Sequence, residues 1–377
     1  MMENIYTSAK NCISCNSTAT DKIFEIKKLT VADQLNSDIN HKSIEVPLTL
    51  LKCKNCDLVF IKELVRPEFL FPQNYPYFTG VSTVLVQHFK ELALSLIKKL
   101  NLDEKSFVLD IGSNDGTALN YFKKRGISVL GIDPTTRPSL KAILLGVPTL
   151  RVFWNEETAL IVGEEINRKA DLILCNNVIS HVDNSRDFIK SLDNVCDDNT
   201  TIIAEFPYIK SIVEKNAFDI IFHQHVSYFS LESFESLIQQ FGFYVNDAKI
   251  LNVHGGNLRV FFSKNKRETS QLQKLKTDEK DGAINNIKTL NKFVINIEKI
   301  KAKTIQLLDQ LHSDGKKVLG YGAAGKATTF VKYFEIDNQR MSGIIDKNKF
   351  KQNKYFPAYN HKIYSPDILS NNNEKPD

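Results

Sequence analysis

Short apolar runs alternate with amphipathic segments between residues 107 and 263. The runs FVLDIG, SVLGID, DLILCNN and TTIIAEF each have the length and content of a buried strand, and helical spacing separates them. This alternation predicts a largely parallel α/β sheet. Two later strand-like runs, YVNDAKIL and NLRVFFSK, bracket Gly255 and Gly256. We expect them to pair antiparallel, because a parallel crossover would need a dozen or more residues.

Helical spacing marks two segments outside this region. Leu85, Phe89, Leu92 and Leu96 lie on one helical face, so an amphipathic helix is expected from about Ser82. A long helix is expected from the apolar positions Ile287, Leu290, Val294, Ile297, Ile305, Leu308 and Leu311. Beyond it, KKVLGYGAAGKATTFVKYF predicts a strand, a glycine-rich turn and a helix, and GIIDKN predicts a second strand. The run VRPEFLFPQNYPYFTG is an aromatic, proline-rich connector and not a long helix.

A chain of 377 residues is too long for one ordinary compact domain. Its content, 42% hydrophobic and 25% charged, is that of globular proteins. We expect four parts along the chain: a small cysteine-bearing lobe (1–66), an α/β domain with a leading helix (67–268), a connecting helix (269–313) and a C-terminal α/β lobe (314–377).

The charge and the hydropathy exclude several classes of protein. A net charge of +5, from 49 basic and 44 acidic residues, is too small and too scattered for a nucleic-acid groove, though it weakly favours an anionic ligand. No apolar run approaches the roughly 20 residues of a membrane span, and MMENIYTSAKNC has no signal-peptide core. We therefore expect a cytoplasmic protein without nucleic-acid or membrane partners, in which the six cysteines are metal ligands or core thiols and not disulfides.

Four of the cysteines form two Cys-x-x-Cys pairs, Cys12 with Cys15 and Cys53 with Cys56. Four thiolates in such pairs can close a tetrahedron around Zn²⁺. The long stretch between the pairs costs only loop-closure entropy, which grows slowly with length. A site saturated by four cysteines has no open position, so its role would be structural. The alternative is four unrelated thiols.

The run VLDIGSNDGT ends a strand at Asp110 and turns through Gly112 and Gly116 into a helix. Such a turn lets a ligand approach the backbone near a helix N-terminus. The next strand ends at Asp133, which is placed to accept hydrogen bonds from ribose hydroxyls. Acid, glycine and glycine after the first strand and an acid after the second predict an S-adenosylmethionine site; a structural turn is the alternative. Further cofactor candidates are Asn114, Asp115, Asn176 and Asn177.

Two other motifs carry polar chemistry. In FHQHVSYFS, His223 and His225 lie on the same face if the segment is extended. They could then be a pair of metal ligands, a base with its orienting partner, or polar residues at a sheet edge. The turn from Gly320 through Gly322 to Gly325, followed by Lys326, matches the Gly-x-Gly-x-x-Gly fingerprint of a pyrophosphate site, with Asp346 about twenty residues on. A dinucleotide or a nucleotide-sugar would fit it equally. Cys175 and Cys196 are expected in the core.

Taken together, the order of these parts resembles the nucleotide-sugar C-methyltransferases, which act on keto-deoxysugars. The resemblance rests on the cysteine pairs and on YPYFTGVS, DIGSNDGT, CNNVISHV, EFPY, HVSYFSLESF, HGGNLRVF, GYGAAGKATT and IDKNKFKQNKYFP. It implies a central Rossmann-like class I methyltransferase domain flanked by a zinc-binding lobe and by a C-terminal α/β lobe that helps to hold the sugar nucleotide. Against that family the C-terminal lobe, ending soon after SPDIL, looks truncated.

The resemblance also implies a reaction. A base removes a proton from carbon 3 of a 4-keto sugar, and the enolate takes the methyl group of S-adenosylmethionine. The implied catalytic candidates are His225, Gln224, Tyr75, Tyr77 and His223. The implied substrate contacts are His181, Tyr228, Gly322, Lys326 and Lys351, for a sugar linked to dTDP, CDP or GDP. A monomer or a homodimer is expected.

One departure from the family matters for mechanism. The family motif Tyr-His-Glu-His reads Phe222-His223-Gln224-His225 here, and a neutral amide cannot accept a proton as a carboxylate does. Three explanations stay open: methylation of a sugar oxygen or nitrogen, His225 acting alone, or a catalytically impaired binding homologue. A nicotinamide-dependent oxidoreductase, based on the glycine-rich turn, is the remaining alternative.

Overall fold

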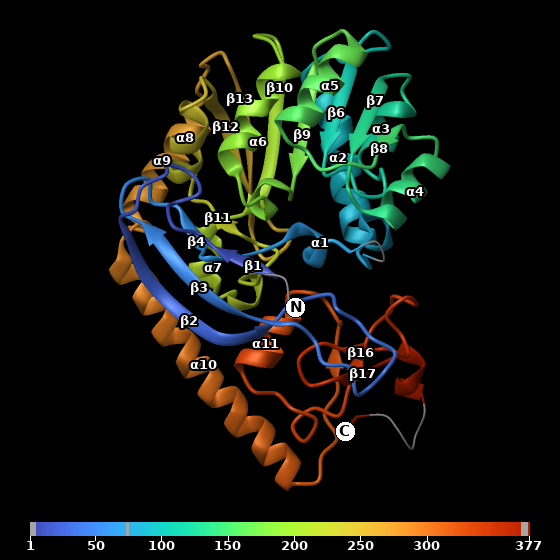
Figure 1. Cartoon of the computed structure of the whole chain (residues 1–377), viewed down its shortest axis with the longest axis vertical. Coiled ribbons are helices and arrows are strands. Elements are labelled where there is room, and N and C mark those ends of the chain that lie inside the picture. Colours follow the sequence, from blue (N-terminus) through green and yellow to red (C-terminus); the bar gives the residue numbers. More distant parts are fainter. Residues whose placement is uncertain (1–4, 73–74, 371–375) are drawn as a thin grey trace.

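The computed structural model describes residues 5–72, 75–370 and 376–377. Figure 1 shows the α/β domain in the upper half of the molecule, with a long curved hairpin of the N-terminal lobe below it, alongside helix α10 (Ile287–Ser313). The C-terminal lobe lies at the lower right. In the described part of the chain, no helix is long and apolar enough to cross a membrane.

The central sheet has the strand order β12-β13-β10-β9-β6-β7-β8. Strands β8, β7, β6, β9 and β10 run parallel, while β13 is antiparallel to both β10 and β12. The strands cover Phe107–Ile111 (β6), Ser128–Ile132 (β7), Thr149–Leu150 (β8), Leu172–Asn176 (β9), Thr201–Pro207 (β10), Tyr244–Leu251 (β12) and Asn257–Ser263 (β13). The α/β prediction and the antiparallel pair are confirmed, and the domain is Rossmann-like.

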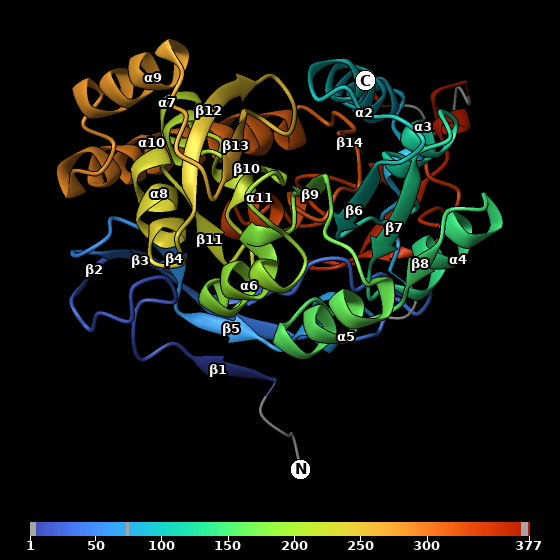
Figure 2. The same ribbon diagram turned by 90° about the horizontal axis from the view of Figure 1, so that it is seen from above.

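Helices cover both faces of this sheet (Figure 2). On one face, Leu92 of α2 and Phe122 of α3 join one buried cluster; on the other, Phe188 of α6 and Leu237 of α8 join another. Helix α2 begins at Thr83, as its spacing predicts, with Ser82 as N-cap. The helices of this domain cover Thr83–Lys99 (α2), Leu119–Lys123 (α3), Thr136–Leu144 (α4), Glu156–Ile166 (α5), Ser185–Ser191 (α6), Ile209–Lys215 (α7) and Leu231–Gln239 (α8).

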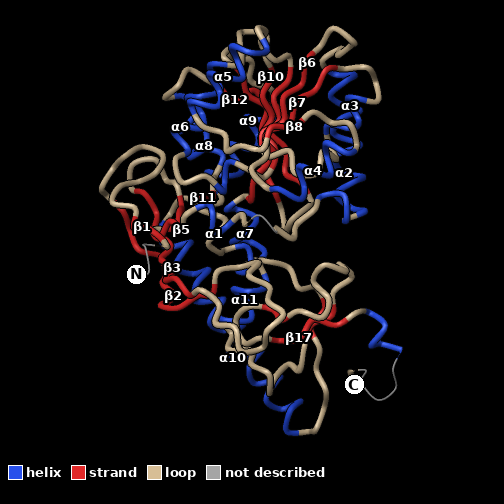
Figure 3. Tube along the Cα trace, turned by 45° about the vertical axis from the view of Figure 1, so that its right-hand side comes forward, coloured by secondary structure: helices blue, strands red, loops and turns tan. Residues whose placement is uncertain are grey.

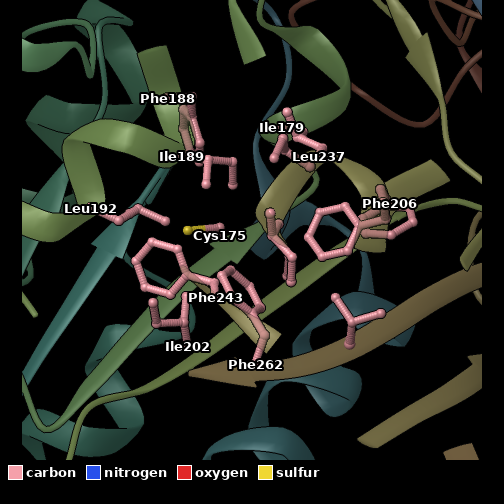
Figure 4. Packing of buried hydrophobic residues seen from close by; sticks show 14 of the residues in the cluster. Cys175, Ile179, Phe188, Ile189, Leu192, Ile202, Phe206, Leu237, Phe243 and Phe262 are labelled. Carbon is pink, nitrogen blue, oxygen red and sulfur yellow. The ribbon is translucent and has the colours of Figure 1, made fainter. Parts of the chain in front are cut away.

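The core of the α/β domain contains Cys175, which lies within the third predicted strand run and in strand β9. Cys175 lies among Phe188, Leu192, Ile202 and Phe243 (Figure 4). It is 1% exposed, and burial raises the pKa of its thiol well above the ordinary value. Cys196 is also buried. Both thiols are therefore core residues, as expected.

The N-terminal lobe is built on strands that the sequence pattern did not reveal. The stretch between the two cysteine pairs, for which no strands were predicted, forms an antiparallel hairpin of β2 with β3. Strand β11 joins the same sheet by pairing with β4, which ties the His223–Tyr228 segment to the N-terminal lobe. The elements are Tyr6–Ser8 (β1), Thr20–Thr30 (β2), Glu45–Cys53 (β3), Val59–Ile61 (β4), Glu63–Val65 (β5), Pro67–Leu70 (α1) and Ser227–Tyr228 (β11).

The connecting helix and the C-terminal lobe complete the chain. Helix α10 is buried at Leu290, Phe293 and Ile297, whereas Ile305, Leu308 and Leu311 are only partly buried. Figure 3 shows that much of the C-terminal lobe is loop. The predicted strand before the glycine-rich turn shrinks to two residues. The remaining elements are Ser270–Asp281 (α9), Gly320–Tyr321 (β14), Ala327–Tyr333 (α11), Ile344–Ile345 (β15), Tyr355–Phe356 (β16) and His361–Tyr364 (β17).

Candidate active site

A cavity of about 650 Å³ lies at the carboxyl ends of the central strands. Its walls come from the N-terminal lobe, the connector after α1, the α/β domain and the glycine-rich turn of the C-terminal lobe. The carboxyl edge of a parallel sheet is the usual ligand site of open α/β folds. Of the residues that the sequence singled out, the cavity wall includes Tyr75, Tyr77, Asp110, Gly112, Asn114, Asp133, Asn176, Asn177, His181, Gln224, His225, Gly322, Lys326 and Lys351.

Two buried carboxyls, Asp110 and Asp133, lie at the ends of neighbouring strands β6 and β7. Asp133 accepts hydrogen bonds from the backbone N–H groups of Asn114 (2.8 Å) and Thr135 (2.9 Å). Burial raises the pKa of Asp133 despite these bonds, and burial with the nearby Asp133 charge raises the pKa of Asp110 well above its ordinary value. Among the described residues, no basic side chain pairs with either carboxyl. The pair therefore favours a cationic ligand.

The turn after Asp110 requires glycine at position 112 because of its backbone conformation. Gly112 has φ of +78°, and a Cβ there would lie 2.9 Å from Cβ of Val178. Further along the turn, Asp115 anchors the connector instead of facing the cavity. Asp115 pairs with Lys141 (2.6 Å) and accepts a hydrogen bond from the Gly80 N–H (3.0 Å), and neither Asp115 nor Gly116 lines the cavity. Their assignment as cofactor contacts stays a prediction.

Several buried polar atoms on the cavity wall have no hydrogen-bond partner among the described residues. They are the hydroxyl of Ser113, the indole N–H of Trp154 and both amide atoms of Asn176. Unsatisfied buried polar groups are rare in folded proteins, and a ligand that pairs with them removes the cost. Together with the acidic pair, these groups fit S-adenosylmethionine, which carries a sulfonium, an ammonium and ribose hydroxyls. Asn177 instead accepts a hydrogen bond from the Asn257 amide (2.6 Å).

Two neutral imidazoles stand together on the cavity wall. Nδ1 of His225 lies 2.8 Å from the Ile220 carbonyl, and Nδ1 of His181 lies 2.6 Å from the Gln224 carbonyl. A carbonyl only accepts, so each Nδ1 carries the proton and each Nε2 keeps its lone pair. The centroids of the two imidazole rings are 4.9 Å apart. Burial lowers the pKa of His181 to about 4 and that of His225 well below its ordinary value.

Phenol groups from the connector complete this wall. Tyr75 is 8% exposed, and burial raises the pKa of its hydroxyl well above the ordinary value, with the Asp33 charge as a further cause. Its hydroxyl therefore stays protonated and can donate a hydrogen bond to a developing oxyanion. Tyr77 lies beside Tyr75, and the centroids of the two rings are 6.4 Å apart.

Two of the sequence candidates brace the site from behind and do not line the cavity. Nε2 of His223 lies 3.1 Å from the Pro47 carbonyl, and His223 is 1% exposed. The hydroxyl of Tyr228 accepts a hydrogen bond from the Phe222 N–H (3.2 Å). The segment is thus held against the N-terminal lobe, which brings Gln224 and His225 to the cavity while His223 faces away.

The structure adds one carboxylate that the sequence did not indicate. The Gln224 amide donates hydrogen bonds to the Leu70 carbonyl (3.0 Å) and to Oδ2 of Asp33 (3.3 Å). Asp33 lines the cavity, yet it lies in a loop after β2 that carries no motif. Packing between segments far apart in the sequence places it beside Gln224, so no contiguous signal in the sequence could have found it.

The glycine-rich turn closes the far part of the cavity. Nζ of Lys351 donates to the Ala323 carbonyl (2.6 Å), while the Ala323 N–H donates to Asp346 (2.8 Å). Lys326 forms an ion pair with Asp219 (2.8 Å). Asp346 therefore holds the turn. Gly322, with φ of +98°, leaves open space above the turn because none of the described residues has an atom within 4 Å of its missing Cβ.

The four paired cysteines come together in the N-terminal lobe. Their Sγ atoms all lie within 4.8 Å of one another, with Cys12 and Cys56 at 3.6 Å and Cys15 and Cys53 at 3.5 Å. Zn–S bonds of about 2.3 Å in a tetrahedron place sulfurs about 3.8 Å apart. A disulfide would require about 2.0 Å. The cluster is therefore compatible with zinc.

Comparison with known proteins agrees with this geometry. Residues 86–248 match the family described as methyltransferase domain, and residues 252–377 match the family described as C-methyltransferase C-terminal domain. The C-methyltransferase NovU of Streptomyces niveus is 26% identical over 374 residues, which cover 97% of this chain and 88% of NovU.

Solved structures with a similar central domain include two methyltransferases. Magnesium protoporphyrin IX methyltransferase of Synechocystis with bound SAH has a TM-score of 0.38 and 14% identity, over 49% of this chain and 88% of that chain. A S-adenosylmethionine-dependent methyltransferase from Clostridium acetobutylicum has a TM-score of 0.37 and 12% identity, over 47% and 91%. The chain is thus a S-adenosylmethionine-dependent methyltransferase, and its two family matches and its likeness to NovU support a place among the C-methyltransferases.

Proposed function

We propose that this enzyme methylates a carbon of a nucleotide-linked keto sugar. The observation that carries the proposal is one continuous cavity whose wall holds an acidic pair, a pair of neutral imidazoles and a glycine-rich turn. These are a site for a cationic methyl donor, a site for proton transfer and a site for a phosphorylated substrate. The likeness to the C-methyltransferase NovU supports carbon as the methylated atom.

The donor end of the cavity is assigned to S-adenosylmethionine, which supplies an electrophilic methyl group when bound. Asp133 would accept hydrogen bonds from the ribose hydroxyls, because its carboxylate is already held by two backbone N–H groups. Asp110 and Gly112 would receive the amino-acid end. Burial raises the pKa of both acids and so disfavours their charged forms, which a positive charge beside them would favour; this cofactor therefore suits them better than a nicotinamide dinucleotide with its anionic pyrophosphate.

The chemistry is assigned to the imidazole and phenol wall. A carbon next to a keto group becomes nucleophilic when it loses a proton, so the site must accept that proton and stabilise the enolate oxygen. His225 assists the deprotonation, since its Nε2 lone pair is free while Nδ1 is held by Ile220. Tyr75 donates to the oxyanion, and the glycine-rich turn with its lysines receives the diphosphate of a dTDP-, CDP- or GDP-linked sugar.

The N-terminal cysteine cluster is assigned to a structural zinc ion. Four thiolates leave no open coordination position, and the cluster lies apart from the cavity wall. We also propose that the chain divides into its parts at residues 66, 268 and 313. None of the six cysteines is in a disulfide, which fits a reducing compartment such as the cytoplasm.

The test is transfer of an isotopically labelled methyl group to dTDP-, CDP- and GDP-linked sugars, each in a keto form and in the matched hydroxyl form. The proposal expects label only in a keto form. Equal labelling of the hydroxyl form, which has no acidic carbon, would overturn carbon methylation. Absence of label in every nucleotide-linked sugar would overturn the substrate class.

A further inference from the structure

Asp33 is a carboxylate of the N-terminal lobe that reaches into the cavity of the α/β domain. It lies three residues after β2 and has φ of +60°, a conformation that aspartate tolerates better than most residues. The side chain is half-buried, and it lines the cavity with Gln224, Tyr75 and Tyr77. A non-glycine residue in this backbone region at a cavity wall often marks a functional position.

The Asp33 carboxylate lies where three separate segments of the chain meet. Gln224 donates one amide hydrogen to Oδ2 of Asp33 and the other to the Leu70 carbonyl, so the amide cannot turn its oxygen toward Asp33 without losing both bonds. From the C-terminal lobe, Gly325 makes room, because a Cβ there would lie 2.6 Å from the same oxygen. The N-terminal lobe, the α/β domain and the C-terminal lobe therefore meet at Asp33.

Asp33 differs from Asp115 and Glu205 because no cationic side chain among the described residues pairs with it. Asp115 pairs with Lys141, and Glu205 pairs with Arg259. Within residues 5–72, 75–370 and 376–377, no Lys or Arg forms an ion pair with Asp33, and its one side-chain partner is a neutral amide. Asp33 therefore brings a carboxylate without a cationic partner to the cavity wall.

We propose that Asp33 is a catalytic carboxylate of this site, which takes the proton from the substrate carbon next to the keto group. This inference rests on the proposed function, because it requires a keto substrate. The C–H bond breaks, the proton passes to the Asp33 carboxylate, and the electron pair becomes an enolate whose oxygen accepts a hydrogen bond from Tyr75. The enolate carbon then bonds to the methyl group of S-adenosylmethionine as the S–CH₃ bond breaks, and the carboxylic acid returns its proton to water.

The experiment measures exchange of the substrate C–H with solvent deuterium, which reports deprotonation without methyl transfer. The probe is a dTDP-linked 4-keto-6-deoxyhexose in D₂O with S-adenosylhomocysteine, followed by proton NMR, with the CDP- and GDP-linked forms in parallel. Asp33→Asn should slow exchange by about 100-fold or more, the usual contribution of a positioned general base. Asp38→Asn is the matched control, because Asp38 is exposed in the same loop and does not line the cavity.

A charge relocation separates the role of the carboxylate from a folding defect. Asp33→Asn with Gln224→Glu moves the carboxylate across the 3.3 Å contact, and exchange should recover at least tenfold over Asp33→Asn alone. Gln224→Glu alone places two carboxylates next to each other, so the pKa of one of them rises. The pH profile of exchange should therefore shift to higher pH.

Wild-type exchange in Asp33→Asn, or a double variant no faster than Asp33→Asn, would overturn the role of Asp33. Absence of exchange in the wild type with all three nucleotides would instead overturn the proposed substrate class, and the role of Asp33 with it.

Discussion

Replacement of Asp133 by Ala tests the cofactor end of the site. The carboxylate is 6% exposed and accepts two backbone hydrogen bonds, so it is fixed before the ligand arrives. Hydrogen bonds from ribose hydroxyls to a charged acceptor contribute about 1.5–3 kcal/mol. At 1.4 kcal/mol per tenfold change, the affinity for S-adenosylmethionine should fall by about 10- to 150-fold.

Isothermal calorimetry on wild type, Asp133→Ala and Asp133→Asn measures this loss. Asp133→Asn keeps an acceptor oxygen of the same size and removes the charge, so its affinity should lie between the other two. Loss of the carboxylate also leaves the Asn114 and Thr135 N–H groups unpaired, which costs about 1–3 kcal/mol of stability, so thermal unfolding must confirm that each variant is folded at the assay temperature. Equal affinity of Asp133→Ala and wild type would refute the ribose assignment.

Three other predictions follow from the same structure. Cys53→Ser should lose zinc and unfold the N-terminal lobe, because a structural zinc contributes roughly 10 kcal/mol or more to folding. Elemental analysis measures the zinc content and circular dichroism measures the loss of structure. Zinc-free wild-type protein would contradict the assignment. The raised pKa values of Asp110 and Asp133 mean that the free folded enzyme binds more protons than the unfolded chain. Their contribution to stability therefore falls as pH rises, while affinity for S-adenosylmethionine rises; calorimetry between about pH 5 and pH 8 should show this increase, and a flat profile would oppose it. His225→Asn should slow methyl transfer by about 100-fold with cofactor affinity unchanged, and full activity would remove this imidazole from the mechanism.

Much of the central domain could be predicted from the sequence because its strands are buried on both faces. Continuous apolar runs such as Phe107–Ile111 have few other interpretations, and the acids that end them must fall at one edge of the sheet. The β2–β3 hairpin was missed because register shifts interrupt its alternation and charged residues line its exposed face. A propensity-based interpretation has no means to see such strands.

The candidate site was predictable where a motif is contiguous and hidden where it depends on packing between lobes. His223 and His225 were expected to share a face, yet a turn at Phe222–His225 and pairing with the N-terminal lobe send them apart: His223 bonds the Pro47 carbonyl and His225 lines the cavity. Asp33 comes within reach of Gln224 across a sequence separation of 191 residues. Long-range contacts of this kind leave no pattern in a lone sequence.

The atom that receives the methyl group tests the central claim most directly. Wild-type enzyme incubated with ¹³C-methyl S-adenosylmethionine and a dTDP-, CDP- or GDP-linked keto sugar should yield a product in which NMR couples the labelled methyl carbon directly to a ring carbon. The ring proton that this carbon carried should be absent from the product. A labelled methyl bonded to oxygen or nitrogen, with that ring proton retained, would contradict carbon methylation and the role of Asp33 together.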